Sequence, residues 1–151
     1  MTFSGCARRR DRGFTLVELL LIAAIVAIVA AIATPLYVNW RATALNAEAV
    51  RVVEQVIATA RVDAKRTAST FSITLRDGDR SIQGAFGAVR IPHQGMVVTT
   101  APVSFSFSGA LGVQEPFALE EFDVRTGSGR FERTSTVSVI PPLGKTVVGR
   151  R

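Results

Sequence analysis

Residues 14–33 read FTLVELLLIAAIVAIVAAIA and contain a single charged side chain, Glu18. Twenty helical residues at a rise of 1.5 Å measure about 30 Å, the thickness of the hydrocarbon core of a bilayer. The segment therefore predicts a membrane-spanning helix close to the start of the 151-residue chain. It also explains why hydrophobic residues reach 48% of the composition.

Basic residues are unevenly placed around this segment. Arg8, Arg9, Arg10 and Arg12 precede it, whereas no Lys or Arg follows it before Arg41. Basic flanks are retained in the cytoplasm, which fixes the orientation of a spanning helix. We therefore expect a single-pass protein of the inner membrane with a cytoplasmic residue 1 and an exported C-terminal part.

Glu18 needs a physical explanation, because a carboxylate within hydrocarbon is unfavourable by about 2.5–3.5 kcal/mol even on insertion scales. It lies about one turn into the predicted helix, from where its side chain could reach the headgroups. A second explanation is a cation supplied by a neighbouring chain. Cleavage before Phe14 would free an ammonium group and leave the helix attached. At about 4 Å and an effective dielectric of 20, such an amine attracts a carboxylate by roughly 4 kcal/mol. Glu18 is therefore a candidate assembly residue.

Two simpler interpretations of the apolar segment remain open. Ala31, Ile32 and Ala33 resemble a signal-peptidase site, which would make Thr34 the first residue of a secreted domain. The segment could also be an uncleaved signal anchor. A signal peptide is disfavoured because its apolar region has about 7–15 residues, fewer than this run contains, and because Glu18 interrupts the run.

Residues 12–20, RGFTLVELL, resemble the cleavage and methylation signature of type IV prepilins and type II secretion pseudopilins. The resemblance implies that a prepilin peptidase cleaves between Gly13 and Phe14, removes residues 1–13 as a leader and N-methylates Phe14. The leader contains Cys6, the only cysteine. Pro35 falls where many pilins place a helix-kinking proline. The implied partners are this peptidase, other pilin or pseudopilin subunits, and an inner-membrane assembly platform.

The helical pattern continues beyond the apolar segment. Residues 14–35 are expected to form the transmembrane and filament-core part, and residues 36–66 the exported half of the same helix. A proline removes one backbone hydrogen bond without necessarily ending a helix. Apolar residues recur at spacings of three and four: Leu45, Ala49, Val52, Val53, Val56, Ala60 and Ala64.

Residues 67–151 are expected to form a β-rich globular domain. Alternating or continuous apolar runs predict strands at residues 71–75, 96–100, 103–107, 117–124 and 136–140, and residues 81–86 are expected to form a hairpin with the first of these. Glycines and prolines separate the runs. The predicted fold class is α+β and pilin-like, with a long N-terminal helix packed on an antiparallel sheet.

A looser resemblance in the C-terminal half is to the GspH/FimT family of minor pilins and pseudopilins. It rests on residues 103–109 (VSFSFSG), 137–140 (VSVI) and 144–147 (GKTV). The chain lacks the paired C-terminal cysteines of many major pilins, and near its end it has no compact acidic cluster resembling the calcium site of major pseudopilins. The sequence thus favours a minor subunit.

No residue pattern supports catalysis, a metal site or a cofactor. His93 is the only histidine and is expected to be a loop residue. Glu120, Glu121 and Asp123 form an acidic patch that is better explained as a solvated strand face than as a calcium site, since calcium takes six to eight oxygens.

The last seven residues contain three basic side chains and no acidic one, and they are expected to form a solvated tail. Lys145, Arg150 and Arg151 could contact nucleic-acid phosphates, and the FimT resemblance includes pilins that bind DNA during uptake. Three charges support only weak, salt-sensitive binding. A DNA-binding minor pilin for natural transformation is therefore the alternative hypothesis.

Overall fold

The computed structural model describes residues 14–109, 112–142 and 144–150. The chain divides into two compact units, Met1–Tyr37 and Val38–Arg151. The predicted leader, residues 1–13, lies outside the described residues.

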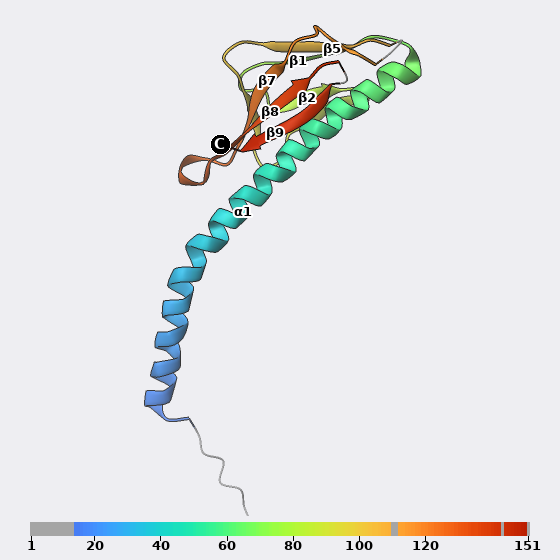
Figure 1. Ribbon diagram of the computed structural model, residues 1–151. Helices are drawn as coiled ribbons and strands as arrows, with labels where there is room; N and C mark the ends of the chain where they lie inside the picture. Colours follow the sequence, from blue (N-terminus) through green and yellow to red (C-terminus); the bar gives the residue numbers. More distant parts are fainter. Residues whose placement is uncertain (1–13, 110–111, 143, 151) are drawn as a thin grey trace, which may run out of the picture. The chain divides into compact units, whose positions relative to one another are not determined.

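Helix α1 spans Leu16–Thr67 and belongs to both units (Figure 1). Pro35 lies inside it, as expected of a proline that does not end the helix. The hydroxyl of Thr34 donates a hydrogen bond to the carbonyl of Ala30 at 2.6 Å. A kink at Pro35 stays a prediction.

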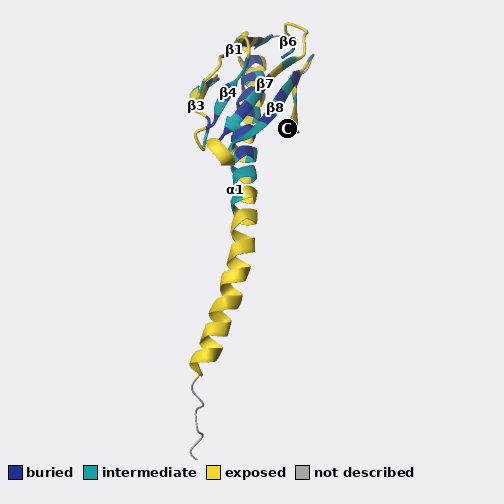
Figure 2. Cartoon of the chain, turned by 90° about the vertical axis from the view of Figure 1, so that its left-hand side faces the viewer, coloured by how far each residue is buried: buried dark blue, intermediate teal, exposed yellow. Residues whose placement is uncertain are grey.

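In the first unit, residues 14–37 are all exposed (Figure 2). Within the described residues, α1 contains one stretch whose length and apolar composition suffice to cross a membrane. None of this stretch is buried among the described residues.

In the second unit, α1 buries one stripe of its surface. The buried residues recur every three or four positions, which is the period of one helix face: Asn46, Ala49, Val50, Val53, Val56, Ile57, Ala60 and Ala64. The apolar periodicity of the sequence predicted this face correctly, although Leu45 and Val52 are only half-buried.

In the part of the chain that the structure describes, nine strands follow the helix and form three antiparallel sheets. One sheet has the order β1-β5-β6, one is the hairpin β2-β3, and one has the order β4-β7-β8-β9. Their bounds are β1 Phe71–Leu75, β2 Ser81–Gly84, β3 Gly87–Arg90, β4 Met96–Val98, β5 Val103–Phe107, β6 Gln114–Glu115, β7 Glu120–Thr126, β8 Arg133–Ile140 and β9 Lys145–Arg150. A short 3-10 helix, η1 Gly129–Phe131, lies between β7 and β8.

The core lies between α1 and the inner faces of these sheets. In β7 and β8 every second residue is buried, including Phe122 and Val124 from β7 and Val137 and Val139 from β8. This alternation is the period of a strand with one covered face. The predicted α+β, pilin-like class is therefore confirmed, with three antiparallel sheets in place of one.

The predicted hairpin between residues 71–75 and 81–86 is wrong. β1 pairs with β5, and β2 pairs with β3 through a two-residue turn in the register Gly84↔Gly87. The reason is the turn after β1: Gly78 donates its backbone N–H to the carbonyl of Val97, and Val97 donates to the carbonyl of Asp79. The turn is therefore bonded to β4 and does not close a hairpin on β1.

The predicted solvated C-terminal tail is also wrong. Residues 145–150 form β9, which pairs with β8 from Ile140↔Lys145 to Ser135↔Arg150. Val147 and Val148 give the segment β propensity, and β8 offers it an edge with matching apolar positions.

Candidate processing and assembly site

The methylation signature coincides with the start of α1. Phe14 and Thr15 precede the helix, and Leu16 is its first residue. The Thr15 hydroxyl accepts a hydrogen bond from the Glu18 backbone N–H at 3.3 Å. Thr15 and Glu18 thus occupy the N-cap and N3 positions, the spacing of a capping box. The pattern Thr-x-x-Glu before an apolar run was a signal for this cap that sequence reasoning missed.

The Glu18 side chain is exposed at the first turn of the helix. A negative charge there is stabilised by the positive end of the helix dipole. No described residue forms a side-chain hydrogen bond or ion pair with its carboxylate. The carboxylate therefore remains accessible to a group from another molecule.

The predicted cleavage point lies immediately before Phe14, whose side chain is 74% exposed. Gly13 itself lies outside the described residues. Because residues 14 and 15 are not helical, cleavage at this point would not require any turn of α1 to unwind.

Residues 8–34 match the family model described as the prokaryotic N-terminal methylation motif. The match supports a type IV prepilin-like protein. It spans the arginine-rich segment, the Gly13–Phe14 bond and most of the apolar part of α1. Such a motif points to a structural subunit rather than an enzyme, and to an anchor in the inner membrane. No curated protein and no solved structure matches the chain.

Two of the candidate DNA-binding residues lie at opposite ends of one strand. Lys145 begins β9 and Arg150 ends it, a separation of about 17 Å at the rise of an extended strand. Arg151 lies outside the described residues. Instead, Lys145 lines a groove of about 490 Å³ together with Arg61 and Lys65 of α1. Sequence reasoning missed this grouping because its members are about 80 residues apart.

His93 lies in a tight turn and contacts the helix. Its backbone φ is +56°, and its Nε2 atom lies 2.8 Å from Oε2 of Glu48. The contact holds the turn before β4 against α1. Among the described residues, no cluster of His, Cys, Asp and Glu could hold a metal ion.

The acidic patch lies on β7, where alternation separates Glu121 and Asp123 from Glu120, as expected. The Ser138 hydroxyl donates a hydrogen bond to the Glu121 carboxylate at 2.9 Å, and the Thr136 hydroxyl donates one to the Asp123 carboxylate at 2.7 Å. Both partners are on β8. The two carboxylates therefore serve as cross-strand hydrogen-bond acceptors on the outer face.

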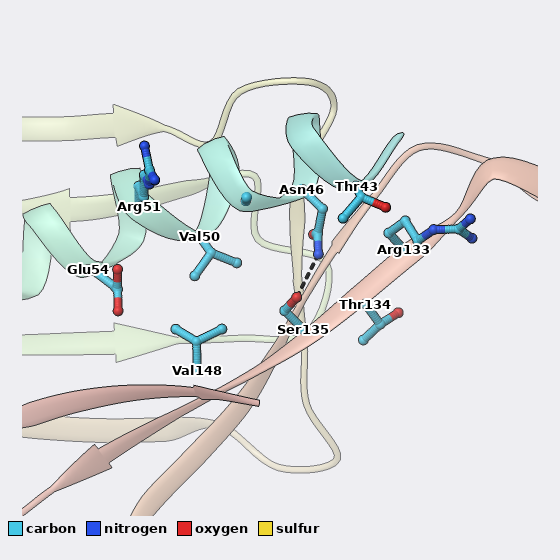
Figure 3. Close-up of a pocket in the computed structure, with 10 residues that line it drawn as sticks. Thr43, Asn46, Val50, Arg51, Glu54, Arg133, Thr134, Ser135 and Val148 are labelled. Atoms are coloured by element: carbon cyan, nitrogen blue, oxygen red, sulfur yellow. Dashed lines mark hydrogen bonds between the residues drawn. The ribbon is translucent and has the colours of Figure 1, made fainter. Parts of the chain in front are cut away.

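A buried polar network joins α1 to the large sheet. The Asn46 side-chain amide donates to the Ser135 hydroxyl at 2.6 Å (Figure 3). The Asn46 side-chain oxygen accepts from the Thr126 hydroxyl at 3.1 Å. All three residues are buried. The network borders a groove of about 330 Å³ that also contains Val50 and Val148. A single asparagine thus pairs with both β7 and β8.

Proposed function

We propose that the chain is a minor pilin or pseudopilin, a structural subunit of a type IV pilus or of a type II secretion pseudopilus. A prepilin peptidase removes residues 1–13 and N-methylates Phe14. The mature protein stays in the inner membrane as a single-pass protein with residues 36–151 exported. It then enters the filament through contacts between α1 and other subunits, delivered by an inner-membrane assembly platform.

The observation that carries this proposal is the methylation motif at residues 8–34, whose later part overlaps a helix that is long and apolar enough to span a membrane. The exposed Glu18 carboxylate also supports it, because in a filament this group would accept the Phe14 ammonium of a neighbour, which offsets the cost of an acid in an apolar segment. The small size of the globular domain and the absence of C-terminal cysteines support a minor role.

Mass spectrometry of the native N-terminus tests the processing step. We expect the mature chain to begin with monomethylated Phe14. A chain that begins at Thr34 would show that the segment is a conventional signal peptide. A chain that retains its arginine-rich leader would show a plain signal anchor, and either result would remove the filament assignment.

The alternative is a DNA-binding minor pilin of the FimT kind. It is favoured by one observation, the grouping of Arg61, Lys65 and Lys145 in one groove. A gel-retardation assay with the full chain in detergent at low salt tests it. DNA binding should weaken in Lys145→Ala, and the dependence of log K on log salt should become shallower by about 0.9 for each phosphate that the variant no longer neutralises. An absence of retardation at low salt would eliminate this alternative.

A further inference from the structure

A groove runs between one side of α1 and strands β8 and β9 in the globular unit, and Figure 3 shows one part of it. Its two parts, of about 330 and 490 Å³, share Glu54. The helix residues that line it recur at spacings of three and four, so that they form one broad stripe: Thr43, Asn46, Ala47, Val50, Arg51, Glu54, Ile57, Ala58, Arg61, Val62 and Lys65. The opposite wall comes from residues 133–135 of β8 and Val148 of β9 in the first part, and from residues 144–146 in the second.

Strand β9 is the outermost strand of its sheet. It pairs with β8 on one side, and none of the described strands pairs with its other side. Val148 pairs with the buried Val137 on the inner face of the sheet and is 38% exposed, so that α1 does not fully cover it. An edge strand presents a row of unpaired N–H and C=O groups to any extended chain that approaches it. Six residues provide an edge of about 20 Å.

The charges along the groove are mainly of one sign. Among the described lining residues, Glu54 is the only acidic one. The five basic side chains are those of Arg51, Arg61, Lys65, Arg133 and Lys145. Two of the five are held in place by hydrogen bonds. Arg61 donates from Nε to the carbonyl of Gly112 at 3.2 Å, and Arg133 donates to Oδ1 of Asn39 at 3.1 Å.

We propose that this groove binds an extended acidic segment of another protein subunit, which adds as a further strand to β9. Backbone hydrogen bonds to β9 would supply affinity, and alternate side chains would supply specificity. Acidic side chains of the partner lie against Arg61, Lys65 and Lys145, and apolar side chains lie against Val148. The proposal does not depend on cleavage after Gly13 or on methylation of Phe14.

The test uses the full chain in detergent with two synthetic hexapeptides, one alternating glutamate and valine and the other alternating lysine and valine. Amide hydrogen exchange of residues 145–150 is followed by mass spectrometry. At a concentration ten times its Kd, the acidic peptide should slow exchange in β9 about tenfold. The basic peptide should leave the exchange rate unchanged.

Charge reversal provides a matched control. Arg61→Glu combined with Lys145→Glu should abolish the effect of the acidic peptide and make β9 respond to the basic one. Arg90→Glu, on an exposed position of β3, should behave like the natural chain. Two results would overturn the proposal. One is binding of the acidic peptide without slower exchange in β9, which indicates charge attraction alone. The other is equal slowing by a DNA duplex, which has no peptide backbone to pair with the strand.

Discussion

Glu18 illustrates how one side chain can serve both folding and assembly. As the N3 residue of the Thr15 cap it favours the start of α1, and as an exposed acid in an apolar segment it requires a cation in the membrane. The two roles use different parts of the residue. The cap uses its backbone N–H, whereas a neighbouring amine would use its carboxylate.

Glu18→Ala should separate these roles. The variant keeps the backbone N–H of residue 18, which bonds to Thr15, and the cleavage point before Phe14. We therefore expect normal insertion and processing. The variant loses the attraction between the Glu18 carboxylate and the Phe14 amine of a neighbour, which is worth roughly 4 kcal/mol. A tenfold change in binding corresponds to about 1.4 kcal/mol, so that incorporation into filaments should fall at least about tenfold. Immunoblots of sheared filaments measure incorporation, and immunoblots of membranes measure the amount of inserted and processed protein. Glu115→Ala, at an exposed position of β6, is the control. Wild-type incorporation of Glu18→Ala would contradict the assembly role.

Asn46 offers a second prediction at the residue scale. Asn46→Leu leaves the buried hydroxyls of Ser135 and Thr126 without their partner, and each unsatisfied buried group costs about 1–3 kcal/mol. We expect the free energy of unfolding of the globular unit to fall by about 2 kcal/mol, as measured by urea denaturation.

Thr59→Ala is the matched control for Asn46→Leu, because the Thr59 hydroxyl is bonded only within its own helix, to the carbonyls of Gln55 and Val56. Its effect should stay within about 0.5 kcal/mol. Equal stability of the Asn46→Leu variant and the natural chain would show that the network does not contribute to folding.

At the scale of elements, the sequence predicted most of what depends on local pattern. The helix was predicted because its periodicity is contiguous, and six strands were predicted because apolar residues alternate or run together within them, although the pairing of residues 81–86 was wrong. Pairing was not predictable in the same way. β1 finds its partner β5 about 30 residues later, and the choice depends on the turn contacts of Gly78 and Asp79 with Val97. β3, β6 and β9 are short or interrupted by glycine and charge, so that their own sequences give little signal.

The same distinction applies to the candidate site. The processing motif is contiguous and could be identified from residues 12–20 alone. The groove between α1 and β9 could not, because it joins Arg61 and Lys65 to Lys145 through the folded sheet. The strand also separates Lys145 from Arg150, which the sequence had placed in one basic tail.

The junction between β5 and the end of α1 gives a prediction for these elements. A Cβ atom at Gly109 would overlap the backbone of Ala68 and Ser69, whereas one at Gly149 would have no atom within 4 Å. We expect Gly109→Ala to lower the free energy of unfolding by about 1–3 kcal/mol, as for other overpacked sites, and Gly149→Ala to have little effect. Thermal unfolding followed by circular dichroism compares them. Equal melting temperatures would show that the two backbones can separate without cost.

At the scale of the whole molecule, the membrane orientation is testable with the chain's own thiol. Cys6 lies in the leader and is the only cysteine. In Ser81→Cys, a second thiol is placed at an exposed position of β2. A membrane-impermeant maleimide applied to intact spheroplasts should label position 81 and should label Cys6 of the precursor only after lysis.

The natural chain, with Cys6 alone, is the control and should remain unlabelled in intact spheroplasts. Labelling of Cys6 before lysis, or protection of position 81, would reverse the proposed orientation. The expected result follows from the arginines before the apolar segment, since basic flanks resist translocation.

Every buried side chain among the described residues comes from positions 46–139. Residues 14–37 contribute no buried side chain to that interior, so that mutations there leave its packing untouched. Natural selection can therefore act on the anchoring segment and on the globular unit separately. The anchoring segment is constrained by the machinery that processes and assembles it. The outer surface of the globular unit can change as its binding partners change.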